Sequence, residues 1–327
     1  MSKYYKLALK NVLNDAEFLE LPNYHRGKVR DSFGIDNNRR LMISTDRQSA
    51  FDKNLCAVPF KGQVLNQTAQ FWFNKLEDIC PNHVIEYLDP NVVIVKNLSM
   101  LPVEIVVRRY LTGSTSTSIW PMYCDGARKV YGNILPNGLI KNERLPSVIL
   151  TPTTKGADGE HDLPITRDEV IDRGLVTYDQ WTQLEALSFA LFDRGQKIAS
   201  QNNLILVDTK YEFGVDSAGQ IFLADEVHTP DSSRYWVATS YDAQFNLGKE
   251  PVSLDKEFLR LWIKKQCDPY KDPIPDIPEA VLIEFSKKYI NLFETITGKD
   301  FRWPDLSVPI RTRIKNSLQT KFPEFFS

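Results

Sequence analysis

The 327-residue sequence has little that would mark a secreted, membrane-spanning or metal-cluster protein. Only four cysteines are present, at positions 56, 80, 124 and 267, and no two of them form a CxxC pair. Structural disulfides and a zinc–thiolate site are therefore not expected. No apolar run approaches the ~20 residues of a membrane span, and the N-terminus lacks the apolar core of a signal peptide. These absences predict reduced thiols and a cytoplasmic location.

An excess of charge of one sign is also missing. The formal net charge is −2 at pH 7, so nothing electrostatic favours a nucleic acid or an anionic membrane as a partner. With 42% hydrophobic and 25% charged residues, the composition is that of a globular protein with a sizeable core. A chain of this length fits two domains. The sequence has neither a Walker A loop nor the HRD and DFG elements of protein kinases.

The most informative charged residues lie between positions 203 and 236. Four apolar residues, 204–207, lead directly into Asp208, Lys210 and Glu212. Because these three occupy alternate positions, a β-strand would place all of their side chains on one face. The segment therefore predicts a buried strand with one charged face.

A returning strand is predicted over residues 221–224, and it leads into Asp225 and Glu226. A two-residue turn would put Asp225 on the face of Lys210, whereas a three-residue turn would put Glu226 there. A solvated hairpin face with a cross-strand Lys–Glu pair is the plain alternative. The apolar flanking strands and the nearby Arg234 instead favour a site for a metal-bound polyphosphate.

A second hairpin is predicted near the N-terminus. Residues 24–33 alternate as a strand with Lys28 and Arg30 on the same face, and residues 34–38 form the turn. A glycine beside two cations could close over phosphates. An ordinary exposed hairpin explains the same pattern.

The β-branched run over residues 100–114 ends in Arg108, Arg109 and a Gly-Ser turn. The planar guanidinium of arginine suits a phosphate or a carboxylate, and the turn adds backbone N–H donors. Residues 112–118 fit a polar interdomain loop equally well. Two polar stretches remain. Residues 44–52 fit either a ligand-binding sheet edge or a helix cap, and residues 151–162 fit a surface loop.

Helical spacing of apolar residues predicts two helices in the first 200 residues and three more near the C-terminus. Their expected ranges are 65–79, 178–200, 254–266, 278–297 and 310–320.

Six stretches in this order resemble the SAICAR synthetase family of purine biosynthesis: GKVRDSF, STDRQSAFD, PVEIVVRRYLTGS, TPTTKGADGEHD, LILVDTKYEFG and ADEVHTPDSSRYW. They span residues 24–260. The extended loops and C-terminal helices resemble the longer, yeast-like branch rather than the short bacterial one, and a monofunctional chain without a carboxylase domain is expected.

The resemblance implies an α+β fold of two domains, related to ATP-grasp proteins. A β-rich N-terminal nucleotide-binding domain is expected over residues 1–113. A larger α+β domain with the C-terminal helices is expected over residues 114–327. The implied reaction is that of a carbon–nitrogen ligase: ATP, CAIR (carboxyaminoimidazole ribonucleotide) and L-aspartate give SAICAR, ADP and phosphate, with Mg²⁺. A monomer or a small homo-oligomer is expected.

Site residues follow from the matching motif positions. The resemblance implies nucleotide contacts from Lys28, Arg30, Met100, Glu104 and Lys155. Short bacterial members have a lysine where this chain has Arg30. The implied contacts to the CAIR phosphate come from Arg108, Ser114, Arg234 and Arg260. Lys210 would contact CAIR, and Mg²⁺ would be held by Glu212 and Asp225. The acceptor and aspartate would lie near Asp46, Ser49 and Asp52.

Amide formation requires a leaving group on the carboxylate, and phosphorylation supplies one. Phosphoryl transfer needs positioning and charge neutralisation more than a nucleophilic side chain. The expected intermediate is therefore an acyl-phosphate on CAIR. The alternatives are a kinase, an ATP-grasp-like ligase with another acceptor, and a nucleotide-binding protein without catalysis, which would release no ADP.

Overall fold

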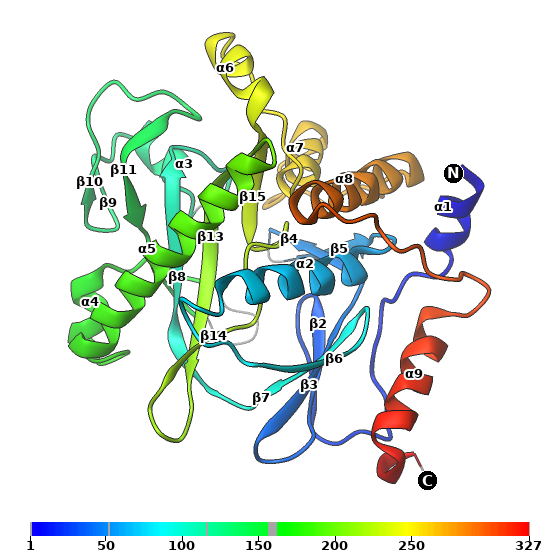
Figure 1. Cartoon of the computed structure of the whole chain (residues 1–327). Helices are drawn as coiled ribbons and strands as arrows, with labels where there is room; N and C mark the ends of the chain where they lie inside the picture. Colours follow the sequence, from blue (N-terminus) through cyan, green and yellow to red (C-terminus); the bar gives the residue numbers. More distant parts are fainter. Residues whose placement is uncertain (1, 52, 116, 156–161, 327) are drawn as a thin grey trace. The chain divides into compact units, whose positions relative to one another are not determined.

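The computed structural model describes residues 2–51, 53–115, 117–155 and 162–326. Helices and strands are mixed along the chain (Figure 1), which confirms the α+β class. The chain divides into two compact units. Unit 1 comprises Met1–Phe73, His83–Leu98 and Phe258–Ser327, and unit 2 comprises Asn74–Asn82 and Ser99–Glu257. The domain boundary expected at residue 113 stays a prediction. Within the described ranges, no helix has the length and apolarity needed to cross a membrane.

Unit 1 is built on a five-stranded antiparallel sheet in the order β1-β2-β3-β7-β6. Its strands are β1 (Tyr24–Arg26), β2 (Arg30–Gly34), β3 (Arg39–Ser44), β6 (Val84–Asp89) and β7 (Val92–Lys96). A separate hairpin pairs β4 (Arg47–Ala50) with β5 (Lys53–Ala57). The helices, of which α2 and α7 extend slightly beyond the unit, are α1 (Ser2–Leu9), α2 (Lys61–Leu76), α7 (Glu257–Gln266), α8 (Glu279–Thr297), α9 (Ile310–Lys321) and the 3₁₀ helix η1 (Pro323–Phe325).

Two apolar clusters form the core of unit 1. One packs the sheet against α9, through Phe33, Leu41 and Ile314 among others. The other joins α2, α7 and α8. The predicted helix ends are confirmed for α8, which begins directly after Pro278 and is followed by Gly298 with φ of 66°. This left-handed conformation is one that glycine adopts readily.

The single strand predicted over residues 24–33 is wrong, because the chain folds back within it. Gly27 N donates to Arg30 O (2.8 Å), and this closes a turn between β1 and β2. A Cβ atom on Gly27 would lie 2.5 Å from Arg30 O, so the turn requires a glycine. Lys28 therefore lies in a turn rather than on a strand face, and the expected second turn follows between β2 and β3.

Unit 2 contains a six-stranded antiparallel sheet, with the path β11-β8-β13-β14 and with β12 and β15 added on β8 and β13. Its strands are β8 (Ser99–Tyr110), β11 (Arg144–Leu150), β12 (Thr153–Thr154), β13 (Leu204–Val215), β14 (Ile221–Ala224) and β15 (Ser233–Val237). A small hairpin pairs β9 (Lys129–Val130) with β10 (Asn133–Ile134). The helices are α3 (Ile119–Cys124), α4 (Arg167–Asp172), α5 (Tyr178–Gln201) and α6 (Ala238–Asn246).

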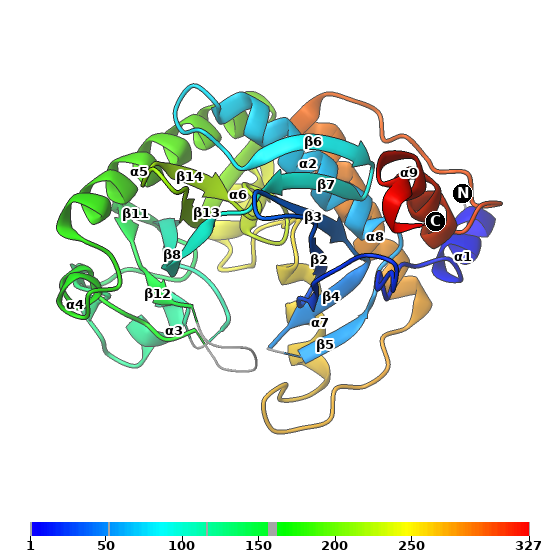
Figure 2. The same ribbon diagram turned by 90° about the horizontal axis from the view of Figure 1, so that it is seen from below.

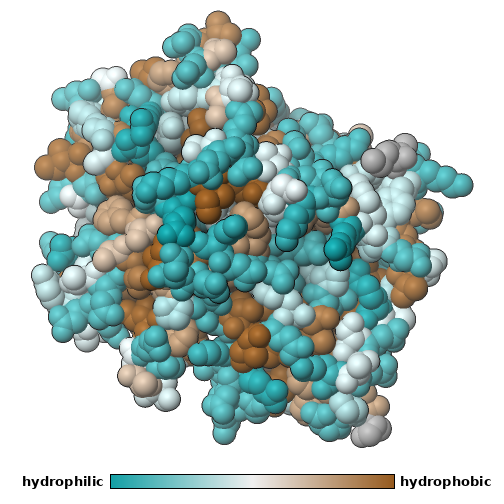
Figure 3. Space-filling model, viewed as in Figure 1, coloured by the Kyte–Doolittle hydropathy of each residue, from teal (hydrophilic) through white to brown (hydrophobic). Residues whose placement is uncertain are grey.

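Helix α5 covers one face of this sheet (Figures 1 and 2). Its predicted start is confirmed: the Thr177 hydroxyl accepts from Gln180 N, and the Gln180 side chain accepts from Thr177 N. Trp181, Leu184 and Leu191 are buried along its inner side. On the molecular face seen in Figure 3, apolar side chains form small patches among polar ones, as is usual for a globular surface.

The turn between β13 and β14 is longer than predicted. Val215 pairs with Ile221, so five residues, 216–220, form the connection rather than two or three. The cause is the Asp216 carboxylate, whose Oδ1 accepts from the N–H groups of Ala218 (2.9 Å) and Gln220 (3.0 Å). The turn length assumed from the sequence therefore cannot tell on which face of the sheet Asp225 lies, and the structure must supply this.

Candidate functional site

One face of the unit 2 sheet carries charged side chains from three strands. Asp208 of β13 pairs directly with Arg108 of β8 and with Arg234 of β15, and Glu212 pairs with Glu104. Directly paired residues point to the same side of an antiparallel sheet. The predicted alternation along β13 is thus confirmed, and it extends to β8 and β15. We call this surface, which also includes Lys210, the charged face.

One end of the charged face is a lysine–acid cluster. Lys210 Nζ lies 2.5 Å from Glu104 Oε1 and 2.6 Å from Glu212 Oε1. Lys155 Nζ lies 2.6 Å from the other Glu212 oxygen. The Thr153 hydroxyl donates to Glu104 Oε2 at 3.1 Å. Cations and anions therefore alternate across this end of the face, and the structure places Glu104 among them.

Electrostatics keep Glu212 ionised in this cluster. Burial by itself would raise the pKa of its carboxyl group, but the charges of Lys210 and Lys155 outweigh burial and hold the pKa well below its ordinary value. Burial also raises the pKa of Glu104, and there Lys210 offsets it only in part. The pKa of Lys210 is raised: burial acts against its charge, but Glu212, Glu104 and Asp225 favour it more strongly. Glu212 and Lys210 are therefore both charged at neutral pH.

Asp225 reaches this cluster through its backbone conformation. It follows the end of β14 with φ of 57°, in the left-handed region, so the strand alternation stops there. Burial acts against the charges of Lys155 and Lys210, but Glu212 and, more weakly, Asp225 raise the pKa of both lysines. Glu226 is instead buried and accepts a hydrogen bond from the Thr229 hydroxyl within the loop. Of the two acids that the sequence left open, Asp225 is therefore the one that acts on the lysines.

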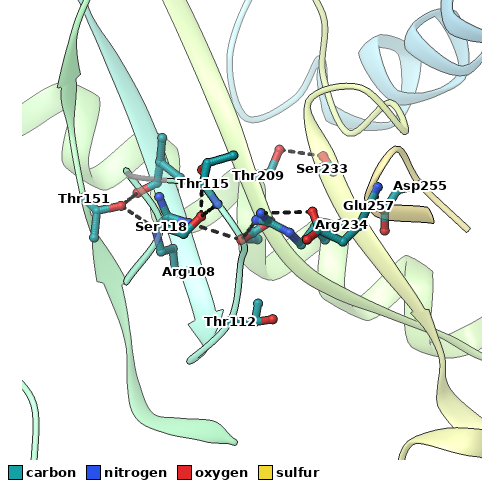
Figure 4. A network of polar contacts seen from close by, with 12 residues as sticks. Arg108, Thr112, Thr115, Ser118, Thr151, Thr209, Ser233, Arg234, Asp255 and Glu257 are labelled. Atoms are coloured by element: carbon teal, nitrogen blue, oxygen red, sulfur yellow. Dashed lines mark hydrogen bonds and ion pairs between the residues drawn. The ribbon is translucent and has the colours of Figure 1, made fainter. Parts of the chain in front are cut away.

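The other end of the charged face is an arginine pair that shares one acid (Figure 4). Asp208 Oδ2 lies 3.4 Å from Arg108 Nη1 and 2.5 Å from Arg234 Nη1. Arg108 also donates to Thr151 Oγ1 (2.7 Å). Arg234 Nη2 lies 3.5 Å from Glu257 Oε2. The guanidinium groups of Arg108 and Arg234 are thus held in fixed orientation by Asp208, and Glu257 lies beside Arg234 as a second acid.

A hydroxyl-rich turn follows β8 beside this pair. Ser114 lies in it, and the Thr115 N–H group donates to Ser118 Oγ (3.2 Å). Gly113 has φ of 105°, and a Cβ atom there would lie 2.3 Å from Ser118 Oγ and 3.0 Å from Arg234 Nη2. Glycine at this position therefore lets the turn approach Arg234 closely.

The remaining predicted residues are distributed as follows. Met100 lies at the start of β8 and is 40% exposed. In unit 1, Lys28 lies in the turn between β1 and β2, and Arg30 begins β2. Ser49 lies in β4 and is half-buried, and Arg260 lies in α7. Asp52 lies outside the described residues.

Asp46 is buried in unit 1 with both carboxylate oxygens bound by the backbone. Oδ2 accepts from Leu13 N (2.8 Å) and Oδ1 accepts from Gly62 N (2.9 Å). Burial raises its pKa to about 6. These contacts tie the N-terminal segment to the start of α2, and its assignment as a substrate contact stays a prediction.

Sequence reasoning did not assign Asp208 and Glu257 to the site, although both bind Arg234. Asp208 had a signal, because it alternates with Lys210 and Glu212. Glu257 had none, since it lies 23 residues after Arg234 and only tertiary contacts bring it there.

His228 lies in the loop between β14 and β15, where its ring packs between Tyr211 of β13 and helix α5. Its Nε2 lies 2.5 Å from the Tyr211 hydroxyl, and a Cβ atom on Gly195 of α5 would lie 2.4 Å from its ring. Burial lowers the pKa of His228 to about 3. The ring is therefore neutral in the folded protein.

The His228→Gln variant should lose a pH-dependent part of the stability. An unfolded histidine binds a proton near pH 6.5, whereas the folded one does so only near pH 3. The wild-type histidine thus contributes stability that is fully present above pH 6.5 and is lost as the pH falls toward 3. In urea unfolding between pH 7 and pH 4.5, the free energy of unfolding of wild type should fall relative to that of His228→Gln by up to about 1.4 kcal/mol for each pH unit. The exposed His25→Gln change should leave the wild-type profile unaltered; an identical profile for His228→Gln would contradict the assignment.

Comparisons with known proteins agree on one family. A family model described as SAICAR synthetase matches residues 23–277. A putative phosphoribosylaminoimidazole-succinocarboxamide synthase 2 of Agrobacterium fabrum is 52% identical over 312 residues, which cover 95% of this chain and 99% of that protein. The corresponding synthase of Legionella pneumophila is 47% identical over 296 residues, with 90% and 94% coverage.

Solved structures give the same result. The SAICAR synthase of Saccharomyces cerevisiae, complexed with SAICAR, superposes with a TM-score of 0.76 at 30% identity. The match covers 89% of this chain and 100% of the yeast one. A SAICAR synthetase in complex with ADP superposes with a TM-score of 0.66 at 26% identity, covering 86% of this chain and 100% of that one.

Proposed function

Since the chain belongs to the SAICAR synthetase family, we propose that the charged face of unit 2 binds CAIR and the phosphate end of ATP. The protein is an ATP-dependent ligase of purine biosynthesis that joins CAIR and L-aspartate to give SAICAR, ADP and phosphate. The observation that carries the proposal is the arrangement of the charged face, with an arginine pair at one end and a lysine–acid cluster at the other.

The arginine pair is the proposed site for the CAIR phosphate. Arg108 and Arg234 are oriented side by side by Asp208, and the turn with Ser114 adds hydroxyl and N–H groups. Charge-assisted bonds from arginine suit a phosphate dianion. Arg260 remains a further candidate contact from α7.

The spacing of the two ends fits a single substrate. Arg108 and Glu104 are four residues apart on β8, which in a strand corresponds to about 13 Å. A ribonucleotide whose phosphate lies at the arginine pair can therefore extend its substituted imidazole along the face. We place the CAIR carboxylate near Lys210, the lysine that extends from the charged face itself.

The lysine–acid cluster also suits a magnesium–polyphosphate. Magnesium prefers one or two protein carboxylates together with phosphate oxygens and water. Glu212, which is held ionised, and Asp225, whose charge acts on the same two lysines, supply such a donor set. No group of three or more metal-binding side chains occurs in the part of the chain that the structure describes. Bound there, Mg²⁺ would neutralise phosphate charge.

Lys155, Lys28 and Arg30 are the proposed side-chain contacts to the ATP phosphates. Lys155 belongs to the cluster itself, and the other two lie in or beside the turn between β1 and β2 of unit 1. Met100, at the start of β8, is the proposed contact of the adenine side, and Glu104 is a proposed nucleotide contact within the lysine–acid cluster. Asp46, Ser49 and Asp52 are proposed for the acceptor and aspartate. The cytoplasmic location stays a prediction, and so does the expectation of a monomer or a small homo-oligomer. The four cysteines are all free thiols, as the sequence predicted.

The chemistry proceeds in two steps. The CAIR carboxylate oxygen attacks the γ-phosphorus of ATP, the bond to the bridging oxygen breaks, and ADP leaves. The amine of aspartate then attacks the acyl carbon, the C–O bond to phosphate breaks, and the amine loses one proton. The protein contributes fixed charges that oppose the developing negative charge, and it needs no covalent intermediate of its own.

ADP release with each substrate omitted in turn tests the overall assignment. We expect ADP only when CAIR is present, and full turnover only with aspartate as well. ADP formation at an undiminished rate without CAIR would contradict the proposed acceptor.

The two steps predict where each oxygen of the CAIR carboxylate goes. With ¹⁸O in the CAIR carboxylate, one labelled oxygen should appear in the released phosphate for each SAICAR formed. Mass analysis of the phosphate provides the measurement, and unlabelled CAIR in ¹⁸O-water provides the control for exchange. Phosphate without label would eliminate the acyl-phosphate and leave the overall reaction intact.

A further inference from the structure

The turn of residues 27–30, which we call the phosphate turn, is bound from the protein interior by Thr45 and Arg47, two residues with no role in the reaction as described so far. Three successive carbonyl groups are involved, those of Gly27, Lys28 and Val29. Arg47 Nη2 donates to Gly27 O (3.0 Å) and Arg47 Nε donates to Lys28 O (3.3 Å). Thr45 donates to Val29 O through its hydroxyl (2.7 Å) and its N–H group (3.0 Å).

This arrangement sets the direction of the turn's peptide groups. The described backbone contains no cis peptide bonds, and in a trans peptide the N–H group points opposite to the C=O group. With three carbonyls directed at Arg47 and Thr45, the N–H group that follows each of them is directed to the opposite side. Successive N–H groups with a common direction favour an anion. The same contacts also hold the Cα atom from which the Lys28 side chain extends.

Arg47 is itself held rigidly. It is 1% exposed, and besides the two turn carbonyls it donates through Nη1 to Asn14 O (2.8 Å). Both of its terminal nitrogens bind the Asp31 carboxylate, with Nη1 at 3.1 Å from Oδ2. These five bonds match the five N–H donors of a guanidinium group. A lysine, with one nitrogen and three donors, cannot reproduce them.

We propose that Arg47 is a positioning residue for ATP: its guanidinium fixes the phosphate turn from inside, so that the turn's N–H groups and the Lys28 side chain are in place to bind nucleotide phosphates. Thr45 assists by holding the third carbonyl. The proposal rests on the proposed contact between the phosphate turn and ATP, and it assigns a role to residues that touch neither substrate.

The test compares Arg47→Lys with wild type in steady-state kinetics and thermal melting. Loss of the positioning should raise the ATP KM by about tenfold, the effect of one charge-assisted hydrogen bond. The CAIR KM and the inhibition constant of adenosine, which has no phosphates, should stay within about twofold of wild type. A purely structural role would lower the melting temperature without separating ATP from adenosine.

Arg313→Lys is the matched control. Arg313 makes a two-pronged ion pair with Asp89 (2.9 and 3.0 Å) and a bond to Asn91 Oδ1 (2.6 Å), all within unit 1, and none of these bonds involves the phosphate turn. This change should lower the melting temperature and leave the ATP KM unchanged. A folded Arg47→Lys variant with an ATP KM like that of Arg313→Lys would overturn the proposal.

Two further variants make the result decisive. If Arg47→Lys fails to fold, Thr45→Val replaces it in the test, because this change removes only a hydroxyl group. We expect the ATP KM of Thr45→Val to rise about fivefold, the effect of one neutral hydrogen bond. An unchanged ATP KM in this variant would overturn the proposal. Lys28→Met tests the premise. If Lys28→Met raises the ATP KM and the Arg47 and Thr45 variants do not, only the positioning role is lost. If Lys28→Met has no effect, the nucleotide contact proposed for the turn is itself wrong.

Discussion

Asp225→Asn should lower turnover by at least about 100-fold while leaving the fold intact, because it removes a charge from the site of phosphoryl transfer. Asparagine has nearly the same shape, so the left-handed backbone at this position, with φ of 57°, is retained. The lost carboxylate leaves Lys155 and Lys210 with one fewer acid to offset their charge. Turnover measured across a magnesium titration, together with a thermal melt, checks both parts of the expectation.

Asp216→Asn is the control for that experiment. Asp216 belongs to the same hairpin, but it is only partly buried and serves the turn through Oδ1, which accepts from two N–H groups. An asparagine oxygen can accept the same bonds, so activity should remain near that of wild type. If Asp225→Asn behaved like this control at ordinary magnesium concentrations, Asp225 would have no place in the site.

Arg108→Ala and Arg234→Ala should each raise the CAIR KM by roughly ten- to a hundred-fold. A charge-assisted hydrogen bond contributes about 1.5–3 kcal/mol, and each ~1.4 kcal/mol corresponds to a factor of ten. The ATP KM should change much less. Both variants should also melt earlier, since each leaves Asp208 with only one of its two buried arginine partners.

Arg109→Ala separates phosphate binding from a general effect of removing an arginine from β8. Arg109 is adjacent to Arg108 but points to the opposite side of the strand, is only half-buried and donates to Pro146 O (3.4 Å). Its CAIR KM should equal that of wild type. A fall in ATP affinity with CAIR affinity retained in the Arg108 and Arg234 variants would show that the two phosphate sites had been assigned in reverse.

The charged face was predictable where it depends on strand periodicity alone. Alternate positions on β13 share a face whatever the neighbours are, so Asp208, Lys210 and Glu212 could be grouped from their spacing. The long apolar stripe of α5 and the proline and glycine at the ends of α8 were likewise local signals.

Prediction failed where hydrogen bonds from a side chain, rather than residue periodicity, control the path of the backbone. The length of the β13–β14 turn depends on the Asp216 carboxylate, which holds two N–H groups and so shifts the pairing of β14. The fold-back within residues 24–33 depends on Thr45 and Arg47, whose contacts no periodicity reveals. Glu257 joins the arginine pair only through tertiary packing.

The alternation along β8 also restricts how the length of this strand can change. Glu104 and Arg108 share a face because an even number of residues separates them. Inserting or deleting a single residue between positions 104 and 108 would turn one of the two side chains toward α5, into a layer that is apolar. Removing two would restore the parity but shorten the separation by about 7 Å, which a substrate of fixed length could not follow. This part of the chain should therefore tolerate substitutions at Val106 far better than any insertion or deletion.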